Sequence, residues 1–230
     1  MSQPEIFPVK IIGHIHTEFA TKFGVPRQSG LAPDLMAKIV FEPEYRNADA
    51  LRGLQDYSHL WLIWQFSRAV RSTWSPTVRP PRLGGNTRMG VFATRSPFRP
   101  NSLGLSCVRL LGVEETEEFG TVLQVGGADL MDGTPIFDIK PYIPYSDSFP
   151  EALGGFTDHA GDFLLKVVFA EDLLDRVAPD TQQALIGVLS HDPRPSYQRD
   201  PERIYGLSFA GYNIRFMVKD GLLTVIDISQ

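Results

Sequence analysis

The sequence predicts a mainly β protein that carries a smaller α+β unit toward its carboxyl end. Short runs of β-branched and aromatic residues, bounded by Gly and Pro, recur up to about Pro150. The one clear helical period comes later, in PDTQQALIGVLSHD at 179–192. A glycine fingerprint of the G-x-G-x-x-G type between a strand and a helix is missing, as is a P-loop. Together these observations disfavour a doubly wound nucleotide-binding fold.

The first part of the chain contains a series of predicted strands. They fall at residues 8–19, 35–45, 59–67, 89–94, 103–114, 121–130 and, after an Asp-Gly turn signal, 134–144. The run HLWLIWQFS at 59–67 is continuously apolar, which favours a strand buried on both faces. A short helix is expected in ADALRGLQDYS at 48–58. WSPTVRPPRLGGN at 74–86 is expected to be a long irregular loop, because its prolines and glycines exclude regular structure.

The composition changes after a polar, glycine-containing connection near residues 151–160. The elements expected beyond it are a strand at 162–169, a helix at 179–192 with Asp180 or Thr181 as N-cap and Ala184, Leu185, Val188 and Leu189 on one face, and a hairpin made by 203–218 and 222–229 around a glycine turn. We therefore divide the chain into a mainly β domain at 1–155 and a small α+β domain at 156–230.

The formal net charge of -5 conceals a basic stretch. Eight arginines and no Lys, Asp or Glu occur between Arg68 and Arg109, so this stretch carries +8 and the remainder -13. The intervening arginines are Arg71, Arg79, Arg82, Arg88, Arg95 and Arg99. Guanidinium groups bind phosphate or carboxylate bidentately and stack on bases. One interpretation is a scatter of arginines that pair with acids elsewhere in the fold; a local anion-binding surface is the favoured one.

Three polar clusters lie at the ends of predicted strands, where loops from one barrel rim can converge. VPRQSG places Arg27 and Gln28 on an early loop. The segment RSPFRPNS displays Arg95, Ser96, Arg99, Asn101 and Ser102 on a backbone stiffened by Pro97 and Pro100. The third cluster, ADLMDGTPIFDIKPY, contains Asp129, Asp132, Asp138, Lys140 and Tyr142, and its acids can accept hydrogen bonds from ribose hydroxyls. The sequence therefore predicts a polar binding site at this rim.

Other candidate groups carry less chemistry. His14 and His16 lie two apart on a predicted strand, so both rings could share a metal, but no third ligand is evident and we expect no metal site. Cys107 lies in an apolar run and is expected to be a small core residue. Asp132 and Asp138 could form the paired carboxylates of a small-molecule hydrolase, although no nucleophile or metal set accompanies them.

Several long motifs resemble the TrmO family, also called YaeB or TsaA-like proteins and grouped with VirR-type proteins. They are GVFATRSPFRPNSLGLS, DLMDGTPIFDIKPYIPYSDS, PPRLGG and LQDYSHLW, with DPRPSY and the terminal hairpin resembling the family's small C-terminal domain. The resemblance implies an S-adenosylmethionine-dependent tRNA methyltransferase that modifies N6 of the threonylcarbamoyl-adenosine beside the anticodon. It also implies a single-sheet β-barrel, distinct from the Rossmann-like methyltransferases, working as a homodimer.

The same resemblance implies a set of cofactor-binding residues. They are Arg27 and Gln28 of VPRQSG, Ser67 and Arg68 after the LWLIWQF strand, Arg95, Leu105 of LGLS, and Asp129, Leu130, Met131 and Asp132 of DLMD. Some family members have histidine near position 67, where this chain has serine. A carbamoylated N6 is a poor nucleophile because its lone pair is delocalised, so a group that accepts its proton is expected. Asp138 and Tyr142 are the candidates by position.

RNA recognition of this kind places the modified base in a pocket and holds the backbone by phosphate contacts. The residues suited to that role are Arg79, Arg82, Arg88, Arg99, Arg194, Tyr197, Arg199 and Arg203. The alternative function is a non-catalytic RNA-binding barrel. The opening MSQPEIFPVK lacks the basic and apolar blocks of a secretory signal, and no membrane-spanning run is present, so we expect a cytoplasmic protein with tRNA as partner and neither DNA nor a membrane.

Overall fold

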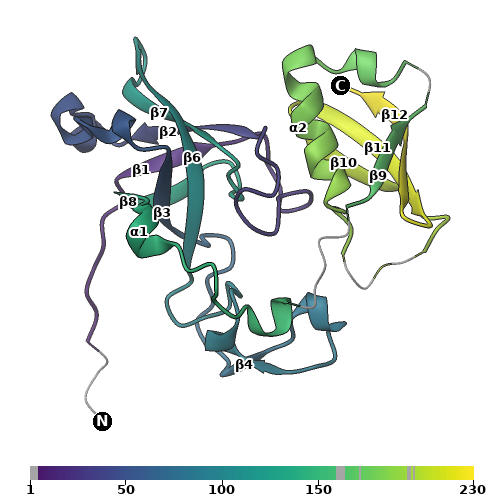
Figure 1. The fold of residues 1–230 in the computed structure, drawn as a ribbon, viewed down its shortest axis with the longest axis horizontal. Helices are drawn as coiled ribbons and strands as arrows, with labels where there is room; N and C mark the ends of the chain where they lie inside the picture. The colour runs from purple at the N-terminus through teal and green to yellow at the C-terminus, as the bar shows by residue number, and fades with distance from the viewer. Residues whose placement is uncertain (1–4, 159–163, 171, 196–197, 199) are drawn as a thin grey trace.

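The computed structural model describes residues 5–158, 164–170, 172–195, 198 and 200–230 (Figure 1). It confirms the predicted mainly β class with few helices. The first part contains β1 (Gly13–His16), β2 (Met36–Phe41), β3 (His59–Gln65), β4 (Thr77–Val78), β5 (Met89–Gly90), β6 (Leu103–Thr116), β7 (Gly120–Gly126), β8 (Thr134–Pro141) and α1 (Pro144–Asp147). The later part contains β9 (Lys166–Phe169), α2 (Pro179–Ser190), β10 (Tyr205–Phe209), β11 (Tyr212–Lys219) and β12 (Leu222–Ser229).

Six antiparallel strands of the first part close into a barrel, in the order β1-β2-β7-β6-β3-β8. The ring closes because β8 pairs with β1, with Ile15 opposite Thr134. Long antiparallel ladders join β6 to both β3 and β7. Inward side chains such as Ile15, Leu62 and Ile136 are fully buried and fill the interior.

The run at 59–67 corrects one expectation. On β3, buried residues alternate with residues that keep part of their surface, so the strand is covered on its inner face only. Leu60, Leu62 and Trp64 point inward, whereas Trp61 and Ile63 are half-buried on the outer face. Alternation holds because a strand in a barrel has one face toward the core and one away from it.

Three local expectations also differ from the structure. The segment 48–58 forms two 3-10 turns, at Ala48–Leu51 and Leu54–Asp56, because Gly53 between them adopts a left-handed conformation with φ 83°. The segment 89–94 continues past the two residues of β5 as a 3-10 turn at Val91–Ala93. The loop at 74–86 is not wholly irregular, since β4 pairs with β5.

The later part forms a four-stranded sheet, in the order β10-β11-β12-β9, against which α2 packs (Figure 1). The predicted hairpin is in fact three strands, because Ala210 and Gly211 both take positive φ and turn the chain between β10 and β11. The helix begins at Pro179, as the predicted range does, but its N-cap is Ala178 and not Asp180 or Thr181, and it ends at Ser190, two residues before the predicted end. Within the described ranges no helix is long and apolar enough to cross a bilayer.

The connection between β1 and β2 belongs to both halves of the molecule. Phe19, Ala32 and Leu35 are buried in the core of the C-terminal sheet and helix, not in the barrel core. Phe19 lies with its ring centroid 5.3 Å from that of Phe209 on β10. Gly24 is packed so tightly against Leu207 that an added Cβ would lie 2.2 Å from a methyl carbon. This connection, residues 17–35, therefore attaches the barrel to the C-terminal unit.

Replacing Gly104 by alanine is expected to destabilise the protein by about 1–3 kcal/mol, because a Cβ there would lie 2.2 Å from the indole of buried Trp64. The measurement is the free energy of unfolding in urea. Gly112→Ala on the same strand is the matched control, since nothing lies within 4 Å of its added Cβ. Equal stability of the two variants would contradict the packing argument.

Candidate functional site

A carboxylate sits in a nearly closed environment at one end of the barrel. Asp129 follows β7, and its Oδ1 accepts a hydrogen bond of 2.6 Å from Ser106 Oγ on β6. Ser106 Oγ in turn accepts one of 3.0 Å from the indole nitrogen of Trp64 on β3. Both Ser106 and Trp64 are buried. The antiparallel register makes this series of hydrogen bonds possible. Trp64 pairs with Gly104, which has no side chain, so the indole has room to reach Ser106, two positions further along β6.

The pKa of Asp129 is raised, chiefly because burial disfavours the charged form. The hydrogen bond from Ser106, backbone N–H groups including that of Ser29, and the positive charge of Arg95 act in the opposite direction. The net shift shows that the donors already present do not fully compensate for lost hydration. A ligand with a hydrogen-bond donor or a positive charge would therefore be bound favourably here.

Two of the other predicted clusters reach the same place. Arg95 donates a hydrogen bond to the side-chain oxygen of Gln28. Next to Gln28, Ser29 Oγ accepts a hydrogen bond of 3.2 Å from the backbone nitrogen of Cys107. Gly30 N donates to Gly127 O at 2.8 Å, which holds the loop against the end of β7. The structure thus brings together Arg27–Gln28, Arg95 and Asp129 at one rim; we call this group the Asp129 site.

Arg27 extends from the Asp129 site toward the C-terminal unit. Its side chain is exposed and donates to the backbone oxygen of Arg194 at 3.5 Å. Ser67 and Arg68 are also exposed, immediately after β3 and the half-buried Phe66. Both arginines leave their charge accessible to an anion.

Leu130 and Asp132 of the DLMD segment point elsewhere, and Met131 between them is half-buried. Leu130 is buried in the barrel core and contributes no exposed surface. The side chain of Asp132 accepts from Thr17 N at 3.2 Å and lies 3.2 Å from His16 Nδ1. Only the first acid of the segment therefore belongs to the buried network, and Asp132 serves the exposed turn that starts β8.

Leu105, Asp138 and Tyr142 lie on the outer face of the barrel. Ile63 on β3 pairs with Leu105 on one side and Asp138 on the other, so these three residues form one row across the strands. Leu105 is 55% exposed, although it neighbours the buried Ser106. Asp138 forms an ion pair of 3.0 Å with Lys140, and the ring of Tyr142 packs 5.9 Å from that of Trp61. We call this surface of β6, β3 and β8 the outer-face row.

The arginines between 68 and 109 form the basic stretch of the chain, and the charge of Arg95 acts on Asp129. Wherever the structure describes their side chains, which excludes Arg82, none of them forms an ion pair. Arg79 and Arg88 are exposed, whereas Arg99 donates to Thr94 O at 3.0 Å. This observation favours the anion-binding interpretation of the segment over structural pairing.

The predicted RNA-binding residues of the C-terminal unit differ among themselves. Arg194 is largely enclosed and bound to Asp192 through Nε at 2.8 Å, which raises the pKa of the guanidinium. Arg203 is exposed, with its guanidinium carbon 5.4 Å from the ring centre of Tyr205. Tyr197 and Arg199 lie outside the described residues. Of the two described arginines of this group, Arg203 presents the more accessible charge.

The two histidines of β1 each have an acidic neighbour. His14 lies 3.1 Å from Glu42, and His16 is paired with Asp132. Across the residues that the structure describes, no three His, Cys, Asp or Glu side chains gather as a metal site would require. Cys107 is half-buried on the outer side of β6.

Sequence reasoning missed the parts of the Asp129 site that orient the carboxylate. Ser29, Trp64 and Ser106 were unremarked as site residues, since a serine and a tryptophan within apolar strands resemble ordinary core positions. The alternation LGLS on β6 contained the signal, because it places a small polar residue and a glycine on the inner face beside an aromatic strand.

The fold defines a class first: a closed antiparallel barrel joined to a small α+β unit, which is not a Rossmann arrangement. Two family models then identify the chain further. The model for the tRNA-methyltransferase O N-terminal domain matches residues 14–148, and the model for the TrmO C-terminal domain matches residues 164–230. The chain therefore belongs to the tRNA-methyltransferase O family, which confirms the resemblance.

Relatives match over nearly the full length. The tRNA (adenine(37)-N6)-methyltransferase of Escherichia coli K12 is 40% identical over 222 residues, covering 93% of this chain and 94% of the relative. A putative S-adenosylmethionine-dependent methyltransferase of Pseudomonas aeruginosa, RcsF, is 37% identical and covers 96% and 97% of the two chains. The crystal structure of TrmO from Pseudomonas aeruginosa superposes with a TM-score of 0.81 at 31% identity, covering 98% of this chain and 99% of that one.

Asp129→Asn is expected to stabilise the ligand-free protein at neutral pH. The raised pKa of Asp129 means that the folded state binds its proton more tightly than the unfolded state does, so ionisation costs stability as the pH rises through that pKa. The amide has no charge to bury, so the advantage of the variant should shrink in acid, where wild-type Asp129 is protonated.

Thermal unfolding of both proteins across the acidic to neutral range measures this difference. Asp34→Asn is the control, because Asp34 is exposed in the same connection. A gap between wild type and Asp129→Asn that is constant with pH would contradict the assignment.

Proposed function

We propose that this protein is an S-adenosylmethionine-dependent tRNA methyltransferase that methylates N6 of adenosine 37. The observation that carries the proposal is the whole-chain match to relatives named for this activity, together with the convergence of three separate loops on the Asp129 site. The lack of a glycine fingerprint agrees with it, since a barrel of this family does not bind its cofactor on a Rossmann turn.

The residues of the Asp129 site suit S-adenosylmethionine. This cofactor has ribose hydroxyls and an ammonium group that donate hydrogen bonds, and a carboxylate that accepts them. Asp129 is a half-buried acceptor whose pKa is raised, Arg27 and Arg95 lie on the loops that meet beside it, and Arg68 is exposed after β3. When bound, the cofactor supplies an electrophilic methyl group. The protein would hold it in line with the acceptor nitrogen and exclude water, which accelerates the reaction mainly through proximity.

The threonylcarbamoyl-modified adenosine is the proposed form of the substrate. Its N6 lone pair is delocalised into the carbamoyl group, so the nitrogen gains nucleophilicity as its proton is withdrawn. Asp138 and Tyr142 remain the candidates for that step. Asp138 is half-buried and lies 3.0 Å from Lys140 Nζ, and its side-chain oxygens are acceptors for a hydrogen bond from N–H.

A homodimer is the proposed assembly, with the outer-face row in its interface. Leu105 and Leu103 project from β6 with 55% and 41% of their surfaces exposed, which is unusual for adjacent outward leucines on a barrel strand. A second subunit there would cover them and would place Asp138 and Tyr142 at the boundary between subunits. The cytoplasm is the proposed location, because tRNA is modified there.

The activity is tested by two measurements. Nucleoside mass spectrometry of tRNA from cells that lack the protein should show loss of methylated threonylcarbamoyl-adenosine. Purified protein with S-adenosylmethionine should restore the methylated nucleoside on that tRNA. Binding of tRNA without any methyl transfer would instead support a non-catalytic RNA-binding barrel.

Arg95→Ala is expected to weaken S-adenosylmethionine binding by at least about tenfold, since a charged hydrogen bond of this kind contributes roughly 1.5–3 kcal/mol. Calorimetric titration of the cofactor measures it. Arg109→Ala is the matched control, because Arg109 is an exposed arginine of the same segment that is not part of the Asp129 site. An equal loss in both variants would show that Arg95 has no particular role.

Arg88→Ala is expected to leave cofactor affinity unchanged and to weaken tRNA binding. Arg88 is exposed in the long loop and unpaired, so a phosphate contact there releases counterions on binding. The slope of log affinity against log salt concentration should fall by about one for the variant. An unchanged slope would place Arg88 outside the RNA-binding surface.

A further inference from the structure

Residues 66–102, between β3 and β6, form a long segment that we call the excursion. It exposes aromatic side chains to solvent. Trp74 is 52% exposed and Phe92 is 71% exposed. Contact of two large aromatic rings with water is unfavourable relative to their burial, so an exposed patch of this kind indicates a binding surface. Neither ring contributes to the barrel core or to the C-terminal core.

The small β4–β5 ladder brings these two rings together. Thr77 pairs with Gly90, and Val91 N donates to Pro76 O at 2.9 Å, which extends the pairing by one step. Trp74 precedes one strand and Phe92 follows the other, so they meet beyond the same end of the ladder. Their ring centroids are 6.2 Å apart and their planes are inclined by 35°.

Two arginines and a third ring, Phe98, lie beside this aromatic pair. The guanidinium carbon of Arg71 lies 3.7 Å from the ring centre of Phe98, which is a close stacking contact. The guanidinium carbon of Arg99 lies 6.0 Å from the ring centre of Phe92, and the same guanidinium donates a hydrogen bond to Thr94 O. Arg71, Trp74, Phe98 and Arg99 also line one cavity of about 110 Å³. None of its described lining residues is acidic.

The cavity has the chemistry of a site for an unpaired nucleotide. Its volume is several times the roughly 30 Å³ that one water occupies in the liquid, so it accepts a larger group. Aromatic faces and guanidinium planes stack on bases of any sequence, and unpaired arginines attract the adjoining phosphates. A protein or membrane partner would not need this combination of stacking planes and uncompensated positive charge.

We propose that Trp74, Phe92, Phe98 and Arg71 form a stacking clamp for an unpaired nucleotide of the substrate RNA, next to the nucleotide that is methylated. The clamp rests on the proposed function for the identity of the RNA, but its stacking role is independent of methyl transfer. Its role is to fix the loop of the RNA on the excursion while the target base is presented to the cofactor that the Asp129 site is proposed to hold.

The test compares two RNAs in equilibrium binding without cofactor: an anticodon stem-loop with unpaired loop bases, and a fully paired duplex of equal length. Trp74→Leu and Phe92→Leu remove an aromatic face and keep an apolar side chain. Each is expected to weaken stem-loop binding by about tenfold and to leave duplex binding unchanged. Trp74→Phe should restore most of the lost affinity, because it restores a ring.

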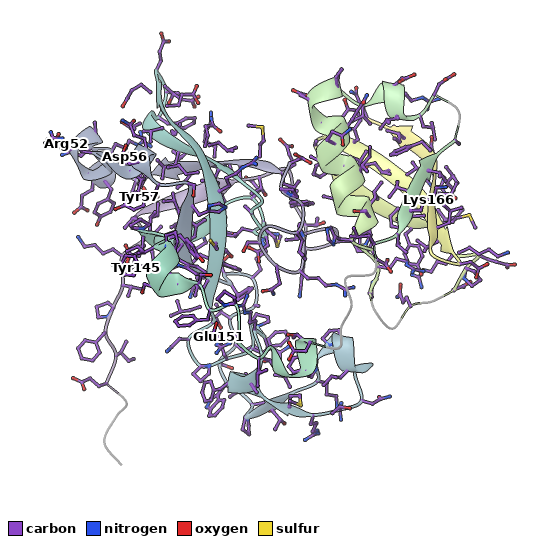
Figure 2. All side chains as sticks on the ribbon, in the orientation of Figure 1. Arg52, Asp56, Tyr57, Tyr145, Glu151 and Lys166 are labelled. Carbon is purple, nitrogen blue, oxygen red and sulfur yellow. The ribbon has the colours of Figure 1, made fainter. Side chains whose placement is uncertain are left out.

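Tyr57→Leu is the matched control. Tyr57 is a partly exposed aromatic residue that lies well away from β4 (Figure 2). It should change neither binding measurement. A separate calorimetric titration with S-adenosylmethionine should give wild-type affinity for Trp74→Leu, which distinguishes failure of the clamp from failure of the cofactor site and of the proposed function.

Three results would overturn the proposal. Undiminished stem-loop binding by both leucine variants would show that the rings do not stack on RNA. An equal loss for stem-loop and duplex would assign the effect to charge. A change of sedimentation behaviour in Trp74→Leu, with RNA binding intact, would assign the aromatic patch to contact with a second copy of this chain.

Discussion

The Asp129 site depends on the connection between β1 and β2, because residues 17–35 are held both by the C-terminal core and by the end of β7. Phe19, Ala32 and Leu35 are anchored in the C-terminal core, while Gly30 is bound to the end of β7 in the barrel. The part of the connection that carries Gln28 lies between these anchors. An otherwise irregular loop is thereby held in a defined position by burial at two places, which a short polar segment could not achieve by its own hydrogen bonds.

The second requirement is a half-buried carboxylate, Asp129, that is oriented by a hydrogen bond. Trp64 and Ser106 provide it, and they can do so only because Gly104 leaves the indole its space. Burying Asp129 costs stability, as its raised pKa indicates, and the apolar packing of the barrel offsets that cost. A ligand that donates hydrogen bonds to Asp129 would offset the lost hydration of its carboxylate. The burial that lowers stability is therefore also what favours binding.

Sequence patterns predicted the elements better than they predicted their contacts. The strands that became β2, β3, β6, β7 and β8 were found because alternation or apolar runs mark them directly. The helix-like segment at 48–58 failed because Gly53 requires a left-handed backbone, which periodicity does not reveal. Asp129 follows β7, as its predicted place after a strand indicated, whereas Arg95 follows a 3-10 turn and not the strand expected at 89–94. The hydrogen bonds from Trp64 through Ser106 depend on register between distant strands, which one sequence does not display.

Positive charge is concentrated in one segment of the protein. The excursion between β3 and β6 carries its arginines without acidic partners wherever their side chains are described, while the acids of the chain lie outside residues 68–109. An approaching polyanion is attracted to the excursion and repelled by the remainder, so a net acidic protein can still orient RNA. Pro97 and Pro100 matter here for an entropic reason, since a stiff backbone keeps Arg95 at the rim while Arg99 faces Phe92. The arginines attract the RNA from a distance, whereas the aromatic rings and the carboxylate of Asp129 act only on groups in direct contact with them.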